Sequence, residues 1–158
     1  MSTVLGAERA LPSTRSARAR TRAVLTANLQ ATLVAAAGAE ALTAVVRATG
    51  VHLAVGDPGG NANSVVPVNV GACSITLAMV MVLGTGLSLV VNRWARRPAT
   101  VYLRTTVLLT TLSLLAPVTA AATSTATKLT LIGAHLLAAA VVIPVVSRAL
   151  GRPLGQQA

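Results

Sequence analysis

Long uncharged stretches of apolar residues dominate the chain and predict its helices. Three intervals, 58–92, 105–127 and 129–147, contain no formally charged residue, and His135 is the one titratable residue of the last. A bilayer core about 30 Å thick is crossed by roughly 20 helical residues, so each interval is long enough. Residues 23–46 form a fourth apolar segment, interrupted by a single carboxylate. The pattern predicts four transmembrane helices, at about 23–46, 71–92, 101–122 and 129–147.

The composition indicates that lipid surrounds these helices. Of the 158 residues 54% are hydrophobic and only 10% are charged, and there is no phenylalanine. A soluble domain of this length could not bury so much apolar surface while offering so few charges to water. We therefore expect one domain, at residues 23–150, with an all-α membrane fold. The predicted architecture is a bundle of four transmembrane helices with up-down-up-down topology.

The distribution of basic residues predicts the orientation of the bundle. Thirteen Lys and Arg against three Asp and Glu give a net charge of +10, and the basic residues lie at the ends of the segments. With the amino terminus in the cytoplasm, eleven are cytoplasmic, and only Arg47 and Lys128 mark outer borders. Lys and Arg in short loops favour the cytoplasmic side, so both termini are expected there. This pattern favours contact with membrane lipid headgroups and argues against nucleic-acid binding.

Polar segments flank and connect the predicted helices. Residues 1–22 are basic and rich in Ser, Thr and Ala, which predicts a disordered cytoplasmic tail, and 151–158 form a second, short one. The first apolar run, of about 24 residues, exceeds the 7 to 15 typical of a cleaved signal peptide, so we expect it to be retained. The extracytoplasmic loop, 47–70, contains the turn sequence DPGGN. The flanking VHLAV and SVVPV runs either pair as a short hairpin, which Pro67 disfavours, or lie on the membrane surface.

Small residues and prolines predict how the helices pack and bend. Small residues four apart, such as Ala35 and Ala39, let helix backbones approach closely in lipid. Similar pairs occur in the second and fourth segments. Pro117 and Pro144 fall inside the third and fourth helices, and a proline there predicts a kink.

The few aromatic residues gather at one predicted interface. Trp94 lies in the cytoplasmic turn NRWARRP and Tyr102 follows it, and the two are the only aromatic residues apart from histidine. Such rings favour the headgroup region. We therefore expect both to anchor the helices at the cytoplasmic border.

One carboxylate, Glu40, lies in the apolar stretch AAAGAEALTAVV. It is seven residues before Arg47, and His135 is seven residues after Lys128, so the two lie at the same depth, about 10 Å below the outer borders. The same spacing places Arg47 above Glu40, and Lys128 above His135, on one face of each helix. Because a carboxylate in lipid requires a partner or a proton, we expect a polar layer in the outer half of the membrane. Its predicted members are Glu40, His135, Thr43, Thr76 and Thr119.

Two hypotheses account for this layer. In the first, Glu40 and His135 line an outward-facing cavity and bind a polar ligand or relay a proton. In the second, a neutral glutamic acid hydrogen-bonds histidine or threonine and only fixes how the helices dock. The sequence leaves both open.

No pattern typical of an enzyme is present. We identify no catalytic residue, no metal ligand set and no cofactor site, because HExxH motifs, phosphate-binding loops and a nucleophile with a nearby base are missing from the sequence. Cys73 is the only cysteine, which excludes an internal disulfide. We expect a protein that is not an enzyme.

Several segments together resemble a family of small bacterial integral membrane proteins known as a domain of unknown function. The resemblance covers about residues 23–150. It is carried by the DPGGN loop, the RWARRP turn, a proline in the third helix and the final helix LTLIGAHLLAAAVVIPVVSRAL, of which AHLLAAAVVIP is the most specific part. It implies a four-helix architecture and supplies no chemistry.

The functional expectation is therefore a multi-pass protein of a bacterial cytoplasmic membrane that acts as a structural or interaction component of the envelope. The alternative is a small proton-coupled or ligand-binding transporter built on the Glu40 and His135 pair. A homo-oligomer and association with other membrane proteins both remain open.

Overall fold

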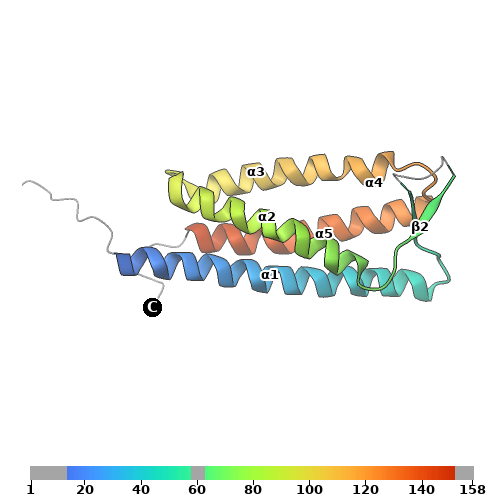
Figure 1. Cartoon of the computed structure of the whole chain (residues 1–158), viewed down its shortest axis with the longest axis horizontal. Coiled ribbons are helices and arrows are strands. Elements are labelled where there is room, and N and C mark those ends of the chain that lie inside the picture. Colours follow the sequence, from blue (N-terminus) through green and yellow to red (C-terminus); the bar gives the residue numbers. More distant parts are fainter. Residues whose placement is uncertain (1–13, 58–62, 152–158) are drawn as a thin grey trace, which may run out of the picture.

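The protein is mostly helical, and its long helices lie side by side. The computed structural model describes residues 14–57 and 63–151. Figure 1 shows consecutive long helices running in opposite directions along the same axis, so that α1 begins and α5 ends at one end of the bundle. The helices are α1 (Thr14–Ala48), α2 (Ala72–Trp94), α3 (Pro98–Ser113), α4 (Leu115–Thr119) and α5 (Thr125–Gly151).

Among the described residues, four helices are long and apolar enough to cross a membrane. These are Arg18–Ala48, Ala72–Trp94, Pro98–Thr119 and Thr125–Gly151. They expose many large apolar side chains, including Leu33 and Leu83, and a helix satisfies its own backbone hydrogen bonds in lipid. The prediction of a mostly helical chain with four membrane-spanning candidates is confirmed.

The first helix starts earlier than expected. α1 begins at Thr14, within the segment 1–22 that was predicted to be disordered. Alternating Arg and Ala in this segment favour a helix, since both are good helix formers. The expectation of disorder is therefore wrong for 14–22. Of the predicted tail at 151–158, Gly151 belongs to α5, and residues 1–13 and 152–158 lie outside the described residues.

The two prolines inside the predicted helices have different effects. Near Pro117 the helix is interrupted at Leu114, between α3 and α4. A proline ring clashes with the carbonyl four residues earlier, here that of Ser113, which explains the position of the break. By contrast, α5 continues through Pro144 without interruption.

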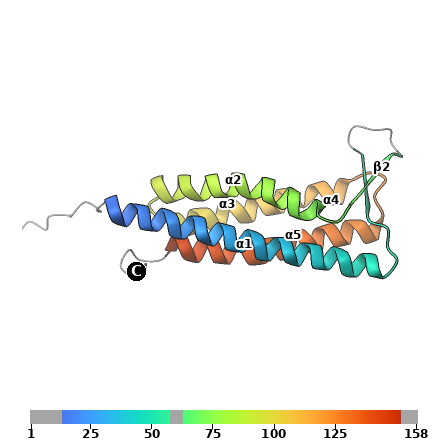
Figure 2. The ribbon, with the colours of Figure 1, turned by 60° about the horizontal axis from the view of Figure 1, so that its bottom comes forward.

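A short hairpin covers one end of the bundle. Strand β1 (Ala54–Gly56) pairs antiparallel with β2 (Val65–Pro67), so the hairpin alternative is confirmed in spite of Pro67. Figure 2 shows β2 at the end of the bundle where α1 ends and α5 begins. The Gly56 N–H donates to Thr123 Oγ1 at 2.9 Å, and a Cβ on Gly56 would collide with the Ala121 carbonyl oxygen. The absence of a side chain at Gly56 therefore lets the hairpin rest on the connection between α4 and α5.

Small residues bring α1 and α5 together, in the most extensive helix contact of the bundle. Ala35 and Ala39 are buried, as predicted for a small-residue pair. A Cβ on Gly38 would lie 2.7 Å from a methyl group of Leu137, so the end of the Leu137 side chain would have to shift to make room for it. Close approach of this kind stabilises helix pairs in lipid, where apolar burial alone gives little driving force.

The two aromatic residues differ in their environment, although the sequence assigned them one role. Trp94 is 78% exposed, which suits an anchor in a headgroup region. Tyr102 is 1% exposed and is the largest fully buried side chain among the described residues. It packs in the core with Val24, Val91 and Leu150. The prediction that Tyr102 is an anchor is wrong, because the ring fills the space where the other helices meet.

Candidate functional site

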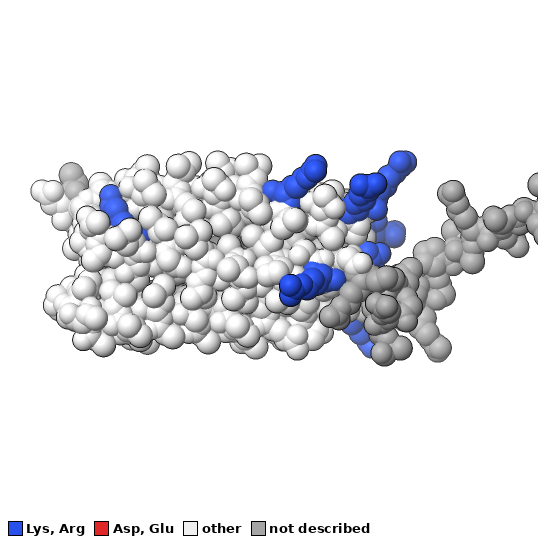
Figure 3. Space-filling model, turned by 180° about the vertical axis from the view of Figure 1, so that it is seen from behind, with Lys and Arg blue, Asp and Glu red and all other residues white. Residues whose placement is uncertain are grey.

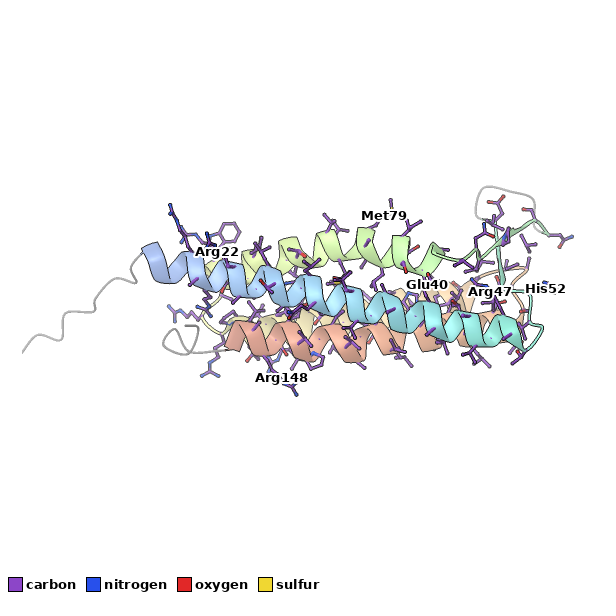
Figure 4. The ribbon with its side chains drawn as sticks, turned by 90° about the horizontal axis from the view of Figure 1, so that it is seen from below. Arg22, Glu40, Arg47, His52, Met79 and Arg148 are labelled. Atoms are coloured by element: carbon purple, nitrogen blue, oxygen red, sulfur yellow. The ribbon has the colours of Figure 1, made fainter. Side chains whose placement is uncertain are left out.

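The carboxylate of Glu40 binds the N-terminus of a neighbouring helix. Glu40 Oε2 accepts a hydrogen bond from the Gly71 N–H at 3.1 Å, and Oε1 accepts from the Ser74 N–H at 3.0 Å and from the Ser74 hydroxyl at 3.1 Å. Figure 4 shows Glu40 on α1, beside the start of α2. We call Glu40, Gly71 and Ser74 the Glu40 clasp.

The clasp supplies a cap that the sequence of α2 lacks. The residue that precedes α2 is Gly71, with φ of 87°, and it makes no side-chain cap hydrogen bond. The first four N–H groups of a helix have no partner within it, and its N-terminus carries a partial positive charge. A carboxylate meets both requirements, and this one comes from another helix. Glu40 therefore fixes where α2 begins relative to α1.

Arg47 and Thr43 extend the clasp along α1. The Arg47 guanidinium donates to the Val68 carbonyl at 2.7 Å and to Thr43 Oγ1 at 3.4 Å. Thr43 is fully buried and donates to the Glu40 carbonyl at 3.0 Å. Val68 in turn donates its N–H to the carbonyl of Leu53, beside the hairpin. The last turns of α1 thus hold the whole segment that leads from the hairpin into α2.

His135 does not join this cluster, contrary to the expected polar layer. Its Nδ1 lies 2.8 Å from the Leu131 carbonyl oxygen, one turn earlier in α5. Glu40 makes its hydrogen bonds to α2 instead. Equal depth in two helices places no constraint on rotation about each helix axis, and that rotation decides which side chains meet. Histidine, one of the two hydrogen-bond partners that the second hypothesis offered for Glu40, is therefore not the partner found here.

The other predicted members of the layer separate as well. Thr43 belongs to the cluster around Glu40, whereas Thr76 and Thr119 are exposed on the outside of the bundle. Thr119 donates to the Leu115 carbonyl of its own helix at 2.7 Å. A threonine that bonds its own helix in this way needs no partner across the bundle. Lys128, expected at an outer border, donates to the Val118 carbonyl of α4 at 3.1 Å.

A second polar contact, which the sequence analysis missed, lies in the other half of the bundle. Asn28 of α1 is 2% exposed and Ser88 of α2 is fully buried. Asn28 Nδ2 donates to Ser88 Oγ at 3.1 Å and to the Val24 carbonyl at 2.9 Å, and the Ser88 hydroxyl donates to the Thr85 carbonyl. In the sequence, the features that could have indicated this contact are the amide of Asn28 in an apolar segment and the small-residue pair Gly84 and Ser88 in the next one. This contact fixes the register of α1 against α2.

The Asn28 and Ser88 contact is expected to stabilise the bundle measurably. Interhelical hydrogen bonds in membranes contribute about 0.6 kcal/mol on average and up to about 1.7. In a double-mutant cycle of Asn28→Ala and Ser88→Ala, we expect a coupling energy in that range, from reversible unfolding in detergent micelles. Gln30→Ala is the matched control, because Gln30 is an exposed amide on the same helix. A coupling energy indistinguishable from zero would show that the contact does not connect the helices energetically.

The interactions that these contacts can make are hydrogen bonds and electrostatic attraction. Within residues 14–57 and 63–151, no group of three or more His, Cys, Asp and Glu side chains could hold a metal ion. Cys73 is a free thiol of intermediate exposure at the start of α2. The described polar side chains that bridge helices mostly meet backbone groups, which is typical of sites that hold a fold together.

Comparison with known proteins finds one family. A model described as a family of unknown function (DUF6069) matches residues 18–152, most of the chain. The match confirms the resemblance to an uncharacterised domain-of-unknown-function family. No curated protein and no solved structure shows significant similarity to the chain.

Proposed function

The chain belongs to the DUF6069 family of unknown function, and from this premise we propose that it is a structural or interaction component of a bacterial envelope. In this proposal it spans the cytoplasmic membrane four times in up-down-up-down topology and performs no enzymatic reaction. It works through contacts with lipids and with other membrane proteins or further copies of itself, and it does not bind nucleic acid.

The single observation that carries this proposal is that the Glu40 carboxylate caps the start of α2. An acid within a membrane helix is often a proton carrier or a ligand site, and a carrier must be able to exchange its partners. Both carboxylate oxygens here accept hydrogen bonds from the first turn of α2. Because the acid already completes a helix end, a structural role accounts for it without a transported ligand.

The proposed orientation places the arginine-rich end in the cytoplasm. α1 begins and α5 ends at that end (Figure 1), and the sequence predicts eleven of the thirteen basic residues on that side of the membrane. Basic residues in short loops favour the cytoplasmic side. Reporter domains fused to the two chain ends are expected on the same, cytoplasmic face. Reporters on opposite faces would rule out four crossings.

A proton-flux measurement distinguishes this proposal from the transporter alternative. The purified protein is reconstituted into liposomes that contain a pH-sensitive dye, and a proton gradient is imposed. We expect the dye signal to decay no faster than in protein-free liposomes. Protein-dependent flux that is lost in a folded Glu40→Gln variant would contradict the structural role and favour proton coupling. Thr119→Ala is the control, because that hydroxyl is exposed and bonds only its own helix.

A further inference from the structure

One end of the bundle carries many arginines and no described carboxylate. We call it the arginine end; it holds the start of α1, the turn between α2 and α3 and the end of α5. Figure 3 shows most of the visible Lys and Arg side chains near that end, the rest at the opposite end, and a surface without charged residues over most of the bundle. The two described carboxylates lie elsewhere, Glu40 beside the start of α2 and Asp57 beside the hairpin. The exposed arginines of this end are Arg18, Arg22, Arg93, Arg96, Arg97, Arg104 and Arg148.

Arg104 and Arg148 lie within α3 and α5, two helices that pack against each other and are apolar enough to cross a membrane. Arg18, Arg22 and Arg93 lie within the other two such helices, α1 and α2. Arg104 is six residues after the start of α3 and Arg148 three residues before the end of α5, about 9 Å and 4.5 Å along their helices. A Cβ on Gly151 would lie 3.5 Å from that of Ala99, so the ends of α3 and α5 are level. Along the helix axes, both arginines therefore lie farther from this end of the bundle than the turn that contains Arg96 and Arg97.

The surroundings of Arg104 are apolar. Val101, Leu103, Val107 and Leu108 are all exposed large hydrophobic residues close to it in α3. A guanidinium on such a surface is costly unless its long side chain reaches a polar group. By contrast, Arg20 at the same end of the bundle has a protein acceptor, the Leu150 carbonyl at 3.0 Å.

We propose that Arg104 and Arg148 bind the phosphate groups of anionic phospholipids in the leaflet around the arginine end. This inference rests on the proposed membrane insertion. Guanidinium binds phosphate with two parallel hydrogen bonds, and it is weakly hydrated compared with an ammonium group. A net anionic headgroup is favoured over a zwitterionic one, since no described carboxylate at this end offsets the arginines. The lipid phosphates thus complete the charge balance of this end.

The test compares two double variants that remove the same charge. The full-length protein is placed in nanodiscs of equal phosphatidylglycerol and phosphatidylcholine, and the lipids that remain bound after mild detergent extraction are measured by mass spectrometry. We expect the wild type to be enriched in phosphatidylglycerol. Arg104→Gln with Arg148→Gln should reduce that enrichment roughly tenfold, and Arg96→Gln with Arg97→Gln by about threefold at most. Both nanodisc leaflets have one composition, so the result does not depend on orientation.

Several outcomes would overturn the inference. Wild-type protein that enters nanodiscs without enrichment contradicts it, as does an equal loss in the two double variants, which would indicate diffuse charge attraction. If the glutamine variant fails to fold, Arg104→Lys with Arg148→Lys replaces it and is expected to lose the two-bond geometry, with a partial loss of enrichment. If the purified protein stays monodisperse without detergent, that result would instead contradict the proposed membrane insertion itself.

Discussion

Glu40→Ala is expected to lower the free energy of unfolding by about 2 to 4 kcal/mol. Hydrogen bonds to a charged group contribute about 1.5 to 3 kcal/mol, and loss of a helix cap costs about 0.5 to 2. The three hydrogen bonds of the clasp are lost together. Gly71 has no side chain to replace them, so the first turn of α2 is left uncapped.

The measurement is reversible unfolding in mixed detergent micelles, with hydrogen exchange at Gly71 and Ser74 as the local readout. The stability of Glu40→Gln is expected to lie between those of the wild type and Glu40→Ala. Its amide oxygen still accepts a hydrogen bond, whereas its NH₂ group cannot accept one from the donors of Gly71 and Ser74. Thr119→Ala serves as the control and should change stability by less than about 0.5 kcal/mol. Unchanged exchange at the start of α2 in Glu40→Ala would show that the clasp does not hold this helix.

The helices could be predicted because their cause is local. Long uncharged stretches require helices in lipid, and this requirement located all four apolar segments to within a few residues at most ends. The start of α1 was misplaced because a basic segment can be either a solvated tail or a helical extension, and the charge pattern alone does not distinguish them. The break at Leu114 followed from Pro117, whereas α5 accommodates Pro144.

The partners of the polar side chains could not be predicted, because they depend on how each helix is rotated and on what lies at its ends. The apolar surroundings of Glu40 correctly indicated that it needs a partner, whereas equal depth grouped it with His135, which does not bind it. The partner is the backbone at Gly71 and the serine that follows in α2, and no sequence motif marks a cap that is supplied by another helix. The contact of Asn28 with Ser88 could not be predicted for the same reason, since the rotation of α1 and α2 decides which residue Asn28 faces.

Tyr102→Ala is expected to destabilise the bundle by about 2 to 4 kcal/mol, and Trp94→Ala by less than about 0.5. Trp94 ends α2 and Tyr102 lies near the start of α3, so they are on either side of one connecting turn. Only Tyr102 is buried. Removing it leaves a cavity in the buried cluster that also contains Val24, Val91 and Leu150. In lipid the unfolded chain stays in an apolar medium, so the cost comes mainly from the contacts that the cavity loses. The measurement is the free energy of unfolding in the same micelles.

Tyr102→Phe separates ring packing from the hydroxyl group. It preserves the ring, so its free energy of unfolding should stay within about 1 kcal/mol of the wild type. The free energy of unfolding of Tyr102→Leu should lie between those of Tyr102→Phe and Tyr102→Ala, because leucine fills part of the cavity. If both rings instead acted through the headgroup region, Trp94→Ala and Tyr102→Ala would cost similar amounts, and Tyr102→Phe would resemble Tyr102→Ala. That result would restore the anchor role for Tyr102, since an anchor acts through its polar edge and a core residue through its volume.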